Sequence, residues 1–289
     1  MTHRCGGPSV SQTVESTAPV HPLPVALARG RPLVMGVLNV TPDSFSDGGL
    51  FYGPAEASER ARRMLAEGAD IIDVGAESTR PYGGARPVSA EEEWRRLQQV
   101  LPAVLELGVP VSVDTMKAAI ATRALALGAA IVNDVWGLQR DPGMADAVAG
   151  HGASVVIMHN RETVEPAIDI VADIEAFFAR SLKLADRAGI ARDRIVLDPG
   201  IGFGKTAEQS VAVLSRLDRL KALGLPLLVG LSRKRFIASI SPSEPDQRLG
   251  GSIAGNVLAV LSGAAIVRVH DVAETIQALR VVAAIRDGR

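Results

Sequence analysis

One pattern recurs about eight times along the chain: a short apolar run is followed by a longer amphipathic stretch. The apolar runs predict buried β-strands, at Val34–Val40, Asp70–Ala76, Pro110–Asp114, Ile131–Val135, Ser154–His159, Arg194–Asp198, Pro226–Leu231 and Ala265–His270. The amphipathic stretches predict helices, including Pro54–Glu67, Ala90–Leu107, Met116–Leu127 and Ile168–Ala188. Because strands and helices alternate in this way in parallel α/β proteins, the pattern restricts the chain to that class.

The number of strand–helix units bears on the architecture. Eight units in 289 residues, without a second change of composition, favour one TIM-type (β/α)8 barrel. An open, doubly wound sheet is the competing architecture. We expect the barrel to form a single domain over residues 31–289. Residues 1–30 are rich in Ser, Thr, Pro and Gly and predict a flexible N-terminal extension, with a short strand near Val25–Ala28 at the base of the barrel.

Composition argues against several classes of partner. The chain has 31 Lys and Arg against 32 Asp and Glu, a net charge of −1, which predicts neither a nucleic-acid nor a membrane partner. Cys5 is the only cysteine, so an internal disulfide is impossible and a reducing compartment is expected. We find no run long enough for a transmembrane helix and no signal-peptide pattern at the start. These features together predict a cytoplasmic protein.

Polar side chains stand where the predicted strands end, which is where barrel enzymes carry their active sites. These positions are Asn39, Asp73 with Glu77, Asp114, Asn133 with Asp134, His159, Asp198, Ser232 with Lys234, and Arg268 with His270. The strand starts are mostly Gly, Ala, Pro and small apolar residues. Any one polar residue could be a helix cap or a loop hydrogen bond, but the whole set predicts a site at the strand ends.

Three of these residues suit a flat heterocycle that bears amino groups. Asp114, Asn133 and Asp198 end three different strands, and their oxygens could accept hydrogen bonds from such a ring edge. The two carboxylates could instead form an acid–base pair or ligate a metal ion. Asp114 could also cap the helix that is predicted to begin at Met116.

A second set of strand-end residues is basic. Arg268 and His270 are two residues apart, so they share one side of a strand, and Lys234 and Arg80 follow two other strands. These residues suit a phosphate group, and Asn39 at the end of the first strand could offer an oxygen to Mg²⁺. For Arg80 and Lys234, a solvated salt-bridge surface is the alternative.

Two loops that follow predicted strands are marked by their glycines. The segment Thr41–Gly49 is longer than most strand-to-helix connections and predicts a binding loop or lid. Gly200–Thr206 looks like a phosphate-binding loop, but Pro199 stands where that motif requires glycine. We interpret the second loop as a tight turn that brings Phe203 beside a bound ring.

Together these motifs resemble those of the dihydropteroate synthase family from Pro32 to the C-terminus. The matching stretches are Gly36–Gly49, Asp73–Pro81, Ser112–Thr115, Asn133–Asp134, Met158–His159, Leu197–Gly200, Ser232–Lys234 and Arg268–His270. The resemblance implies a TIM-barrel transferase of folate biosynthesis. Such an enzyme condenses 6-hydroxymethyl-7,8-dihydropterin diphosphate with 4-aminobenzoate to 7,8-dihydropteroate and pyrophosphate. It also implies a homodimer that sulfonamides inhibit.

The resemblance implies a role for each site residue. The residues it assigns to the pterin are Asp114, Asn133, Asp198 and Lys234, with Met158 and Phe203 beside the ring. The residues it assigns to the diphosphate are Arg268, His270, Thr79 and Asn39, the last of which also binds Mg²⁺. Ser232, Phe203 and Pro81 would form the aminobenzoate pocket, and Arg80 would also contact substrate. In the dissociative mechanism of the family pyrophosphate leaves first, and the expected catalytic residues are Asp114, Asn39, Arg268 and Lys234.

Two other functions remain as alternatives. A pterin-binding methyltransferase domain of a corrinoid system would share the barrel and the pterin carboxylates. It would have no use for an aminobenzoate pocket, so Thr41–Gly49, Glu77–Pro81 and Ser232–Lys234 speak against it. A barrel retained only for binding is disfavoured because every expected site residue is present. The segment Asn160–Pro166 departs from the glycine- and proline-bearing loop common in the family, as does Tyr82 from a common glycine.

Overall fold

The computed structural model describes residues 22–40, 54–77 and 88–288. Several predictions lie outside these ranges. They are the first 21 residues of the N-terminal extension, the Thr41–Gly49 lid, and the substrate residues Thr79, Arg80 and Pro81.

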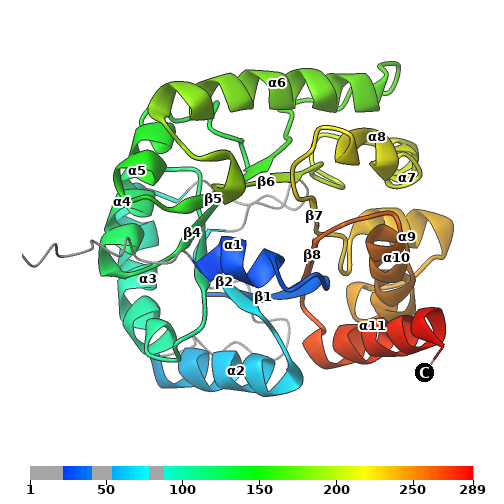
Figure 1. Cartoon of the computed structure of the whole chain (residues 1–289), viewed down its shortest axis with the longest axis horizontal. Coiled ribbons are helices and arrows are strands. Elements are labelled where there is room, and N and C mark those ends of the chain that lie inside the picture. Colours follow the sequence, from blue (N-terminus) through cyan, green and yellow to red (C-terminus); the bar gives the residue numbers. More distant parts are fainter. Residues whose placement is uncertain (1–21, 41–53, 78–87, 289) are drawn as a thin grey trace, which may run out of the picture.

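Eight parallel strands form the centre of the molecule (Figure 1). They are β1 (Leu33–Asn39), β2 (Ile71–Gly75), β3 (Val111–Asp114), β4 (Ile131–Asp134), β5 (Ser154–Met158), β6 (Ile195–Asp198), β7 (Leu228–Val229) and β8 (Ile266–Val269). Their order in the sheet is β6-β5-β4-β3-β2-β1-β8-β7. One parallel bridge between Leu197 of β6 and Leu227, next to β7, joins the two ends of the sheet. The predicted barrel is therefore confirmed, and the open sheet is not.

Helices surround the strands on all sides (Figure 1). They are α2 (Pro54–Glu67), α3 (Ala90–Leu105), α4 (Ala118–Leu127), α5 (Met144–Gly150), α6 (Ile170–Ala188), α7 (Ala207–Leu214), α8 (Leu217–Lys221), α9 (Arg235–Ile240), α10 (Leu249–Leu261) and α11 (Val272–Asp287), with short 3-10 helices at Arg192–Arg194 and Pro245–Arg248. Gly128 and Gly189 end α4 and α6 in the left-handed conformation expected of a helix C-cap. Among the helices of the described residues, none combines the length and the apolar character that spanning a bilayer requires.

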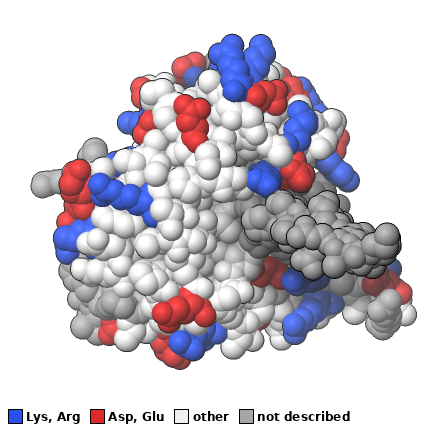
Figure 2. Space-filling view, turned by 60° about the vertical axis from the view of Figure 1, so that its left-hand side comes forward, with Lys and Arg blue, Asp and Glu red and all other residues white. Residues whose placement is uncertain are grey.

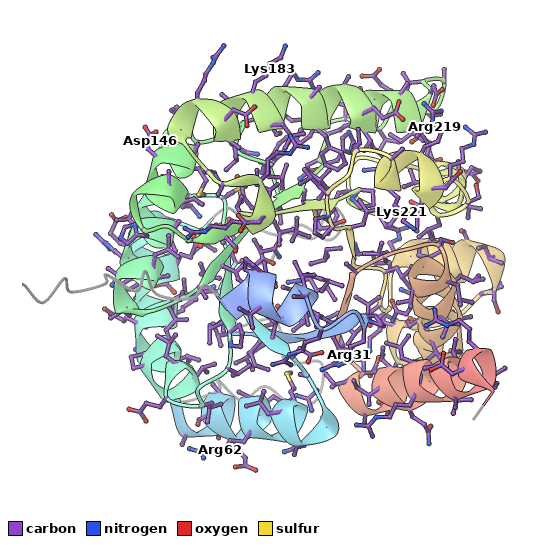
Figure 3. All side chains as sticks on the ribbon, in the orientation of Figure 1. Arg31, Arg62, Asp146, Lys183, Arg219 and Lys221 are labelled. Carbon is purple, nitrogen blue, oxygen red and sulfur yellow. The ribbon has the colours of Figure 1, made fainter. Side chains whose placement is uncertain are left out.

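Charged side chains lie on the outer side of the helix ring. Figure 3 shows Arg62, Asp146 and Lys183 pointing away from the barrel. On the face shown in Figure 2, Lys and Arg side chains are mixed with Asp and Glu. The helices thus present one polar side to solvent, whereas the larger hydrophobic cluster fills the space between their other side and the strands.

The end of the barrel where the strands start is filled with apolar side chains. This cluster consists of Leu33, Met35, Ile71, Ile131, Val156, Val196, Leu228 and Ile266 from the strands, and Leu23 and Ala26 from the helix α1 (Pro22–Leu27). The prediction of a strand near Val25–Ala28 is therefore wrong, although the segment does lie at the base. A closed barrel pairs every strand on both sides and leaves no edge for a ninth. A helix instead places Leu23 and Ala26, three residues apart, on one buried face.

The inward-facing side chains are apolar where the strands start and polar where the strands end. Side chains two residues apart in a strand share a face. Ile71 is therefore followed on the inner face by Asp73, and Val196 by Asp198. The same step leads from Ile131 to Asn133 and from Ile266 to Arg268. Because α1 covers the strand starts, the strand ends remain as the place for a site.

Candidate functional site

Arg268 of β8 binds two carboxylates inside the barrel. Its Nε donates to Asp73 Oδ2 at 2.6 Å, and its Nη2 donates to Asp114 Oδ2 at 2.7 Å. Asn133 Nδ2 donates to the same Asp73 oxygen at 3.3 Å. Four strands (β2, β3, β4 and β8) thus contribute to one hydrogen-bonded cluster. A Cβ on Gly230 would lie 3.6 Å from Arg268 Cβ, so this glycine leaves space beside the arginine.

The cluster contains acceptors that the described residues do not satisfy. Asp73 Oδ1, Asp114 Oδ1 and Asn133 Oδ1 are fully buried and have no hydrogen-bond donor among the described residues. Buried polar atoms are usually paired, and an unpaired one lowers stability by about 1–3 kcal/mol. Such oxygens at the ends of strands are therefore suited to accept hydrogen bonds from a ligand.

A second wall of the site comes from β6 and from the residues after β7. Asp198 ends β6, and its Oδ1 accepts a hydrogen bond from Gly200 N at 2.7 Å. Lys234 Nζ donates to Ile201 O at 2.5 Å and lies 4.6 Å from the centroid of the Phe203 ring. A carboxylate, an ammonium group and an aromatic face therefore stand together.

The turn between β7 and α9 positions two predicted site residues, Ser232 and Lys234. Arg233 has φ of 60°, which is rare for a residue with a side chain. Ser252 Oγ accepts a hydrogen bond from Arg233 N at 2.9 Å, and Arg248 Nη1 donates to Arg233 O at 3.0 Å. Held in this way, the turn places Lys234 in the second wall and Ser232 Oγ 3.1 Å from His270 Nδ1.

The remaining predicted residues of the described ranges also lie at strand ends. Asn39 ends β1 and is the register partner of Gly75, which in turn pairs with Asp114. The Asn39 Oδ1 atom would lie 3.7 Å from a Cβ on Gly75. Met158 ends β5, is buried, and is the register partner of Asp198. The structure thus brings all predicted site residues of the described ranges to one end of the barrel.

Burial shifts the pKa values of the ionisable groups here. Burial raises the pKa of Asp114 to about 7, against the opposing charge of Arg268, and it raises that of Asp198 against Lys234. Burial lowers the pKa of Lys234 to about 8, although Asp198 and Asp114 oppose the shift. Burial also acts to lower the pKa of Arg268, but the carboxylates of Asp73 and Asp114 outweigh it and the net shift is upward. Such shifts are common at functional sites.

One alternative for Asp114 is wrong. Helix α4 begins at Ala118 rather than Met116, and its N-cap residue is Lys117. The carboxylate of Asp114 instead contacts Arg268.

The described residues also contain no cluster of three or more His, Cys, Asp or Glu side chains that could hold a metal ion.

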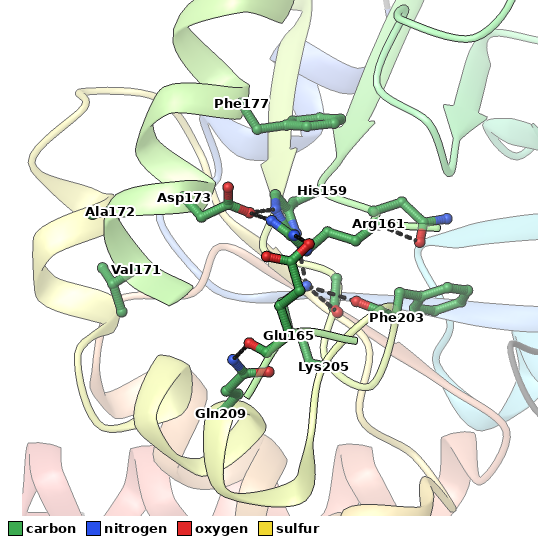
Figure 4. Close-up of polar contacts among 12 residues, drawn as sticks. His159, Arg161, Glu165, Val171, Ala172, Asp173, Phe177, Phe203, Lys205 and Gln209 are labelled. Atoms are coloured by element: carbon green, nitrogen blue, oxygen red, sulfur yellow. Dashed lines mark hydrogen bonds and ion pairs between the residues drawn. The ribbon is translucent and has the colours of Figure 1, made fainter. Parts of the chain in front are cut away.

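Three residues that the structure places in or beside the site, Asp73, His159 and Lys205, have no role that their sequence positions predict. The sequence marks Asp73 and His159 as strand-end residues, and it marks Lys205 only as part of the glycine loop. Asp73 binds Arg268, whereas His159 and Lys205 contact each other under the loop that carries Phe203 (Figure 4). A signal for Asp73 exists, since it is the one charged residue in an otherwise apolar strand.

Comparisons with known proteins agree with this geometry. A family model described as pterin binding enzyme matches residues 35–270. The dihydropteroate synthase of Bacillus subtilis is 45% identical over 262 residues, which cover 90% of this chain and 91% of that protein. A solved dihydropteroate synthase from Yersinia pestis in a sulfonamide drug complex has a TM-score of 0.83 and 43% identity, and the match covers 90% of this chain and 96% of that one.

A second solved structure extends the comparison. It is the dihydropteroate synthase from Thermus thermophilus in complex with 6HMPPP, with a TM-score of 0.78 and 48% identity. The match covers 88% of this chain and 94% of that one. From its fold, its strand-end residues and these similarities, the chain belongs to the dihydropteroate synthase family of pterin-binding enzymes.

Proposed function

We propose that this protein condenses 6-hydroxymethyl-7,8-dihydropterin diphosphate with 4-aminobenzoate, giving 7,8-dihydropteroate and pyrophosphate. The observation that carries the proposal is the pair of buried oxygens Asp114 Oδ1 and Asn133 Oδ1, which lack donors among the described residues. The similarity to the dihydropteroate synthases supports it. These relatives are dihydropteroate synthases, which does not favour the corrinoid methyltransferase alternative.

The pterin ring is assigned to the hydrogen-bonded cluster around Arg268 and to the second wall described above. Its amino-bearing edge would donate to the carboxylate and amide oxygens of Asp114, Asn133 and Asp198. The Lys234 ammonium would donate to a ring acceptor, and Phe203 and Met158 would contact the ring faces. This arrangement satisfies buried groups that would otherwise remain unpaired.

The proposed chemistry is a dissociative substitution at the pterin methylene carbon. The bond between this carbon and the diphosphate oxygen breaks, and pyrophosphate leaves with the electron pair. The buried carboxylate of Asp114 stabilises the resulting pterin cation electrostatically. The aminobenzoate nitrogen then attacks the carbon and releases a proton. Ser232 and Phe203 are assigned to the aminobenzoate pocket, together with Pro81 outside the described residues.

The diphosphate is assigned to Arg268 and His270, with Mg²⁺ as the cofactor. Asn39 supplies one neutral oxygen at the end of β1, and this donor set fits Mg²⁺ because that ion takes few protein ligands when phosphate oxygens supply the rest. Asn39 would hold the ion, and the bound ion would neutralise charge on the leaving diphosphate.

An assay of pyrophosphate release tests the proposal. We expect release to require both substrates and Mg²⁺. Pyrophosphate formed at the same rate without 4-aminobenzoate would show a hydrolase rather than a transferase.

Arg268→Ala tests the assignment of the diphosphate. We expect it to weaken pyrophosphate and the diphosphate substrate more than free 6-hydroxymethylpterin, because only the first two carry the charge that Arg268 would bind. Arg219→Ala is the control, since Arg219 pairs with Glu175 on the outer side of the helix ring (Figure 3). Equal losses for all three ligands would contradict the assignment.

Three further properties are part of the proposal. Sulfonamides are expected to occupy the aminobenzoate pocket, by analogy with the Yersinia pestis complex. A cytoplasmic location is consistent with the single cysteine, Cys5. A homodimer is supported by exposed apolar side chains on two contacting helices, Leu258 and Leu261 of α10 and Val281 and Ile285 of α11. Sedimentation velocity should show a dimer, and Ile285→Lys should convert it to a monomer.

A further inference from the structure

Lys205 is a buried lysine with three close acceptors. It follows the turn Gly200–Gly204 and is only 2% exposed. Its Nζ donates to Gly200 O at 2.8 Å and to Phe203 O at 3.0 Å, and it lies 2.7 Å from His159 Nδ1 (Figure 4). A lysine is rarely buried unless it is paired, so this position needs an explanation.

The contacts of His159 fix its tautomer. Its Nε2 lies 3.0 Å from Asp173 Oδ2, and the Arg161 Nη1 atom donates to the same oxygen at 2.8 Å. These two hydrogen bonds keep the pKa of Asp173 below its usual value although burial acts to raise it, so the carboxylate accepts and Nε2 carries the proton. Burial lowers the pKa of His159 to about 3, so the ring is neutral and Nδ1 is free to accept from Lys205.

The acceptors around Lys205 match its protonated form. Burial lowers the pKa of Lys205 well below its usual value, although the carboxylate of Asp198 opposes that shift. An ammonium group has three N–H bonds, which match the oxygens of Gly200 and Phe203 and the nitrogen of His159. A neutral amine would have only two, so only the protonated form donates to all three acceptors.

The turn that Lys205 holds would be flexible by composition. Gly200, Gly202 and Gly204 all have positive φ, at 64°, 80° and 56°, and glycine adopts many other conformations as readily. At Gly200 the approach is so close that a Cβ would lie 1.9 Å from His159 O. Fixed hydrogen bonds to the turn therefore have to supply the rigidity that its glycines do not.

The turn carries or contacts much of the second wall of the site. Phe203 lies in it, Gly200 N donates to Asp198, and Ile201 O accepts from Lys234. Two lysines from different elements thus bind three carbonyl oxygens of one short turn, those of Gly200, Ile201 and Phe203. A shift of the turn would move Phe203 and change the surroundings of Asp198 together.

We propose that Lys205, oriented by His159 and Asp173, is a positioning residue that holds the Gly200–Phe203 turn in the place where it contacts the pterin ring. The inference rests on the proposed function, because it assigns the turn to that ring. It predicts a selective defect, since the diphosphate is assigned to Arg268 and His270 at the end of β8.

Lys205→Met is the first test, because methionine keeps an unbranched chain and removes the charge and the donors. We expect the affinity for 6-hydroxymethylpterin to fall about tenfold or more, while that for pyrophosphate with Mg²⁺ stays within about twofold, both measured by calorimetry. Lys183→Met on the exposed side of α6 is the matched control and should change neither affinity. Unchanged pterin affinity, or equal losses for both ligands, would overturn the proposal.

Asp173→Ala provides a second variant at a partly exposed position that does not touch the turn's carbonyl oxygens. We expect a smaller loss of pterin affinity of the same selective kind. In the double variant with Lys205→Met the losses should not add, because Asp173 acts on the turn only through His159 and Lys205. Additive losses would show that the two residues act separately and would contradict the chain of contacts.

A measurement on the ligand-free wild type keeps the inference independent of folding defects. Long-range ¹H–¹⁵N correlation spectra should show His159 protonated on Nε2 and accepting on Nδ1. A proton on Nδ1 would overturn the assignment, since Lys205 would then be the acceptor. If the wild type bound no pterin, the proposed function would fail instead, and the calorimetry separates the two outcomes.

Discussion

Three aspartates, Asp73, Asp114 and Asp198, stand inside the barrel beside two cations, Arg268 and Lys234. Arg268 satisfies one oxygen of Asp73 and one of Asp114, and the second oxygen of each remains without a donor among the described residues. The cation therefore keeps the carboxylates buried without using up their capacity to accept. This is what a site for a ligand with several donors requires.

Asp198→Asn should weaken pterin binding and leave the fold intact. The asparagine oxygen can still accept from Gly200 N, but the amide nitrogen would then face the donor edge of the ring. We expect a loss of about 1.5–3 kcal/mol, the usual value for one charged hydrogen bond. Calorimetric titration measures it, and Asp193→Asn, at an exposed position before β6, is the control. Unchanged affinity in Asp198→Asn would remove this residue from the site.

The pKa of Asp114 predicts a pH dependence. Because burial raises this pKa to about 7, the carboxyl group is largely protonated below that pH and accepts fewer hydrogen bonds. Pterin affinity should therefore fall as the pH is lowered from about 8 to about 5, by up to tenfold per unit below the pKa. The Asp114→Asn variant should lose this part of the profile, and an identical profile in both proteins would assign the titration to another group.

The same shift has a consequence for stability with the opposite sign. A carboxyl group whose pKa is higher in the folded than in the unfolded protein binds its proton more tightly when folded. Its contribution to the free energy of unfolding is therefore present at about pH 4 and is lost as the pH rises through about 7. Low pH should thus favour the empty site and disfavour the liganded one.

The sequence shows the chemical identity of the site residues, but it does not show their partners. The polar strand ends can be found because apolar strands make a charged residue conspicuous, as Asp114 and Arg268 illustrate. That Arg268 binds Asp73 depends on the closure of β1 and β8, which brings together residues 195 positions apart. Lys205 cannot be found in this way, since a lysine after a glycine turn is usually exposed.

Among the elements, helix α1 has a defined task at the base of the barrel. Leu23 is fully buried against the inner ends of the strands. Leu23→Ala should lower the free energy of unfolding by about 2–5 kcal/mol through lost burial and a cavity. The exposed Val25→Ala on the same helix is the matched control. Chemical denaturation measures both, and equal small effects would show that α1 does not fill the base.

Periodicity explains which elements the sequence can predict. Long helices such as α2 and α6 are predicted to within two residues at each end, since their apolar face repeats over several turns. The short α1 resembles a strand in sequence, because six residues with two prolines show no period. The positive φ of Arg233 cannot be predicted, because this conformation is imposed by Ser252 and Arg248 from later in the chain.

At the scale of the whole molecule, the eightfold repeat is sufficient to predict a barrel. What it cannot show is that the barrel is closed unevenly. Seven of the eight strand contacts are ladders of two or more register pairs, whereas β6 and β7 meet through the single bridge between Leu197 and Leu227. Strand β7 itself has only two residues, Leu228 and Val229.

Because the barrel is closed unevenly, a bound substrate should stabilise the closed barrel itself. The contact between β6 and β7, called the β6–β7 seam here, has few hydrogen bonds, so the barrel should open locally most often at this place. The backbone amide of Leu197 should therefore exchange with deuterium faster than the amides of β2. The second wall, which is assigned to the pterin, spans this seam, because Asp198 ends β6 and Lys234 follows β7. A bound pterin would therefore bridge the seam, and hydrogen exchange at Leu197 should slow when 6-hydroxymethylpterin is added. Exchange that is unchanged by the ligand would show that the seam opens without disturbing the site.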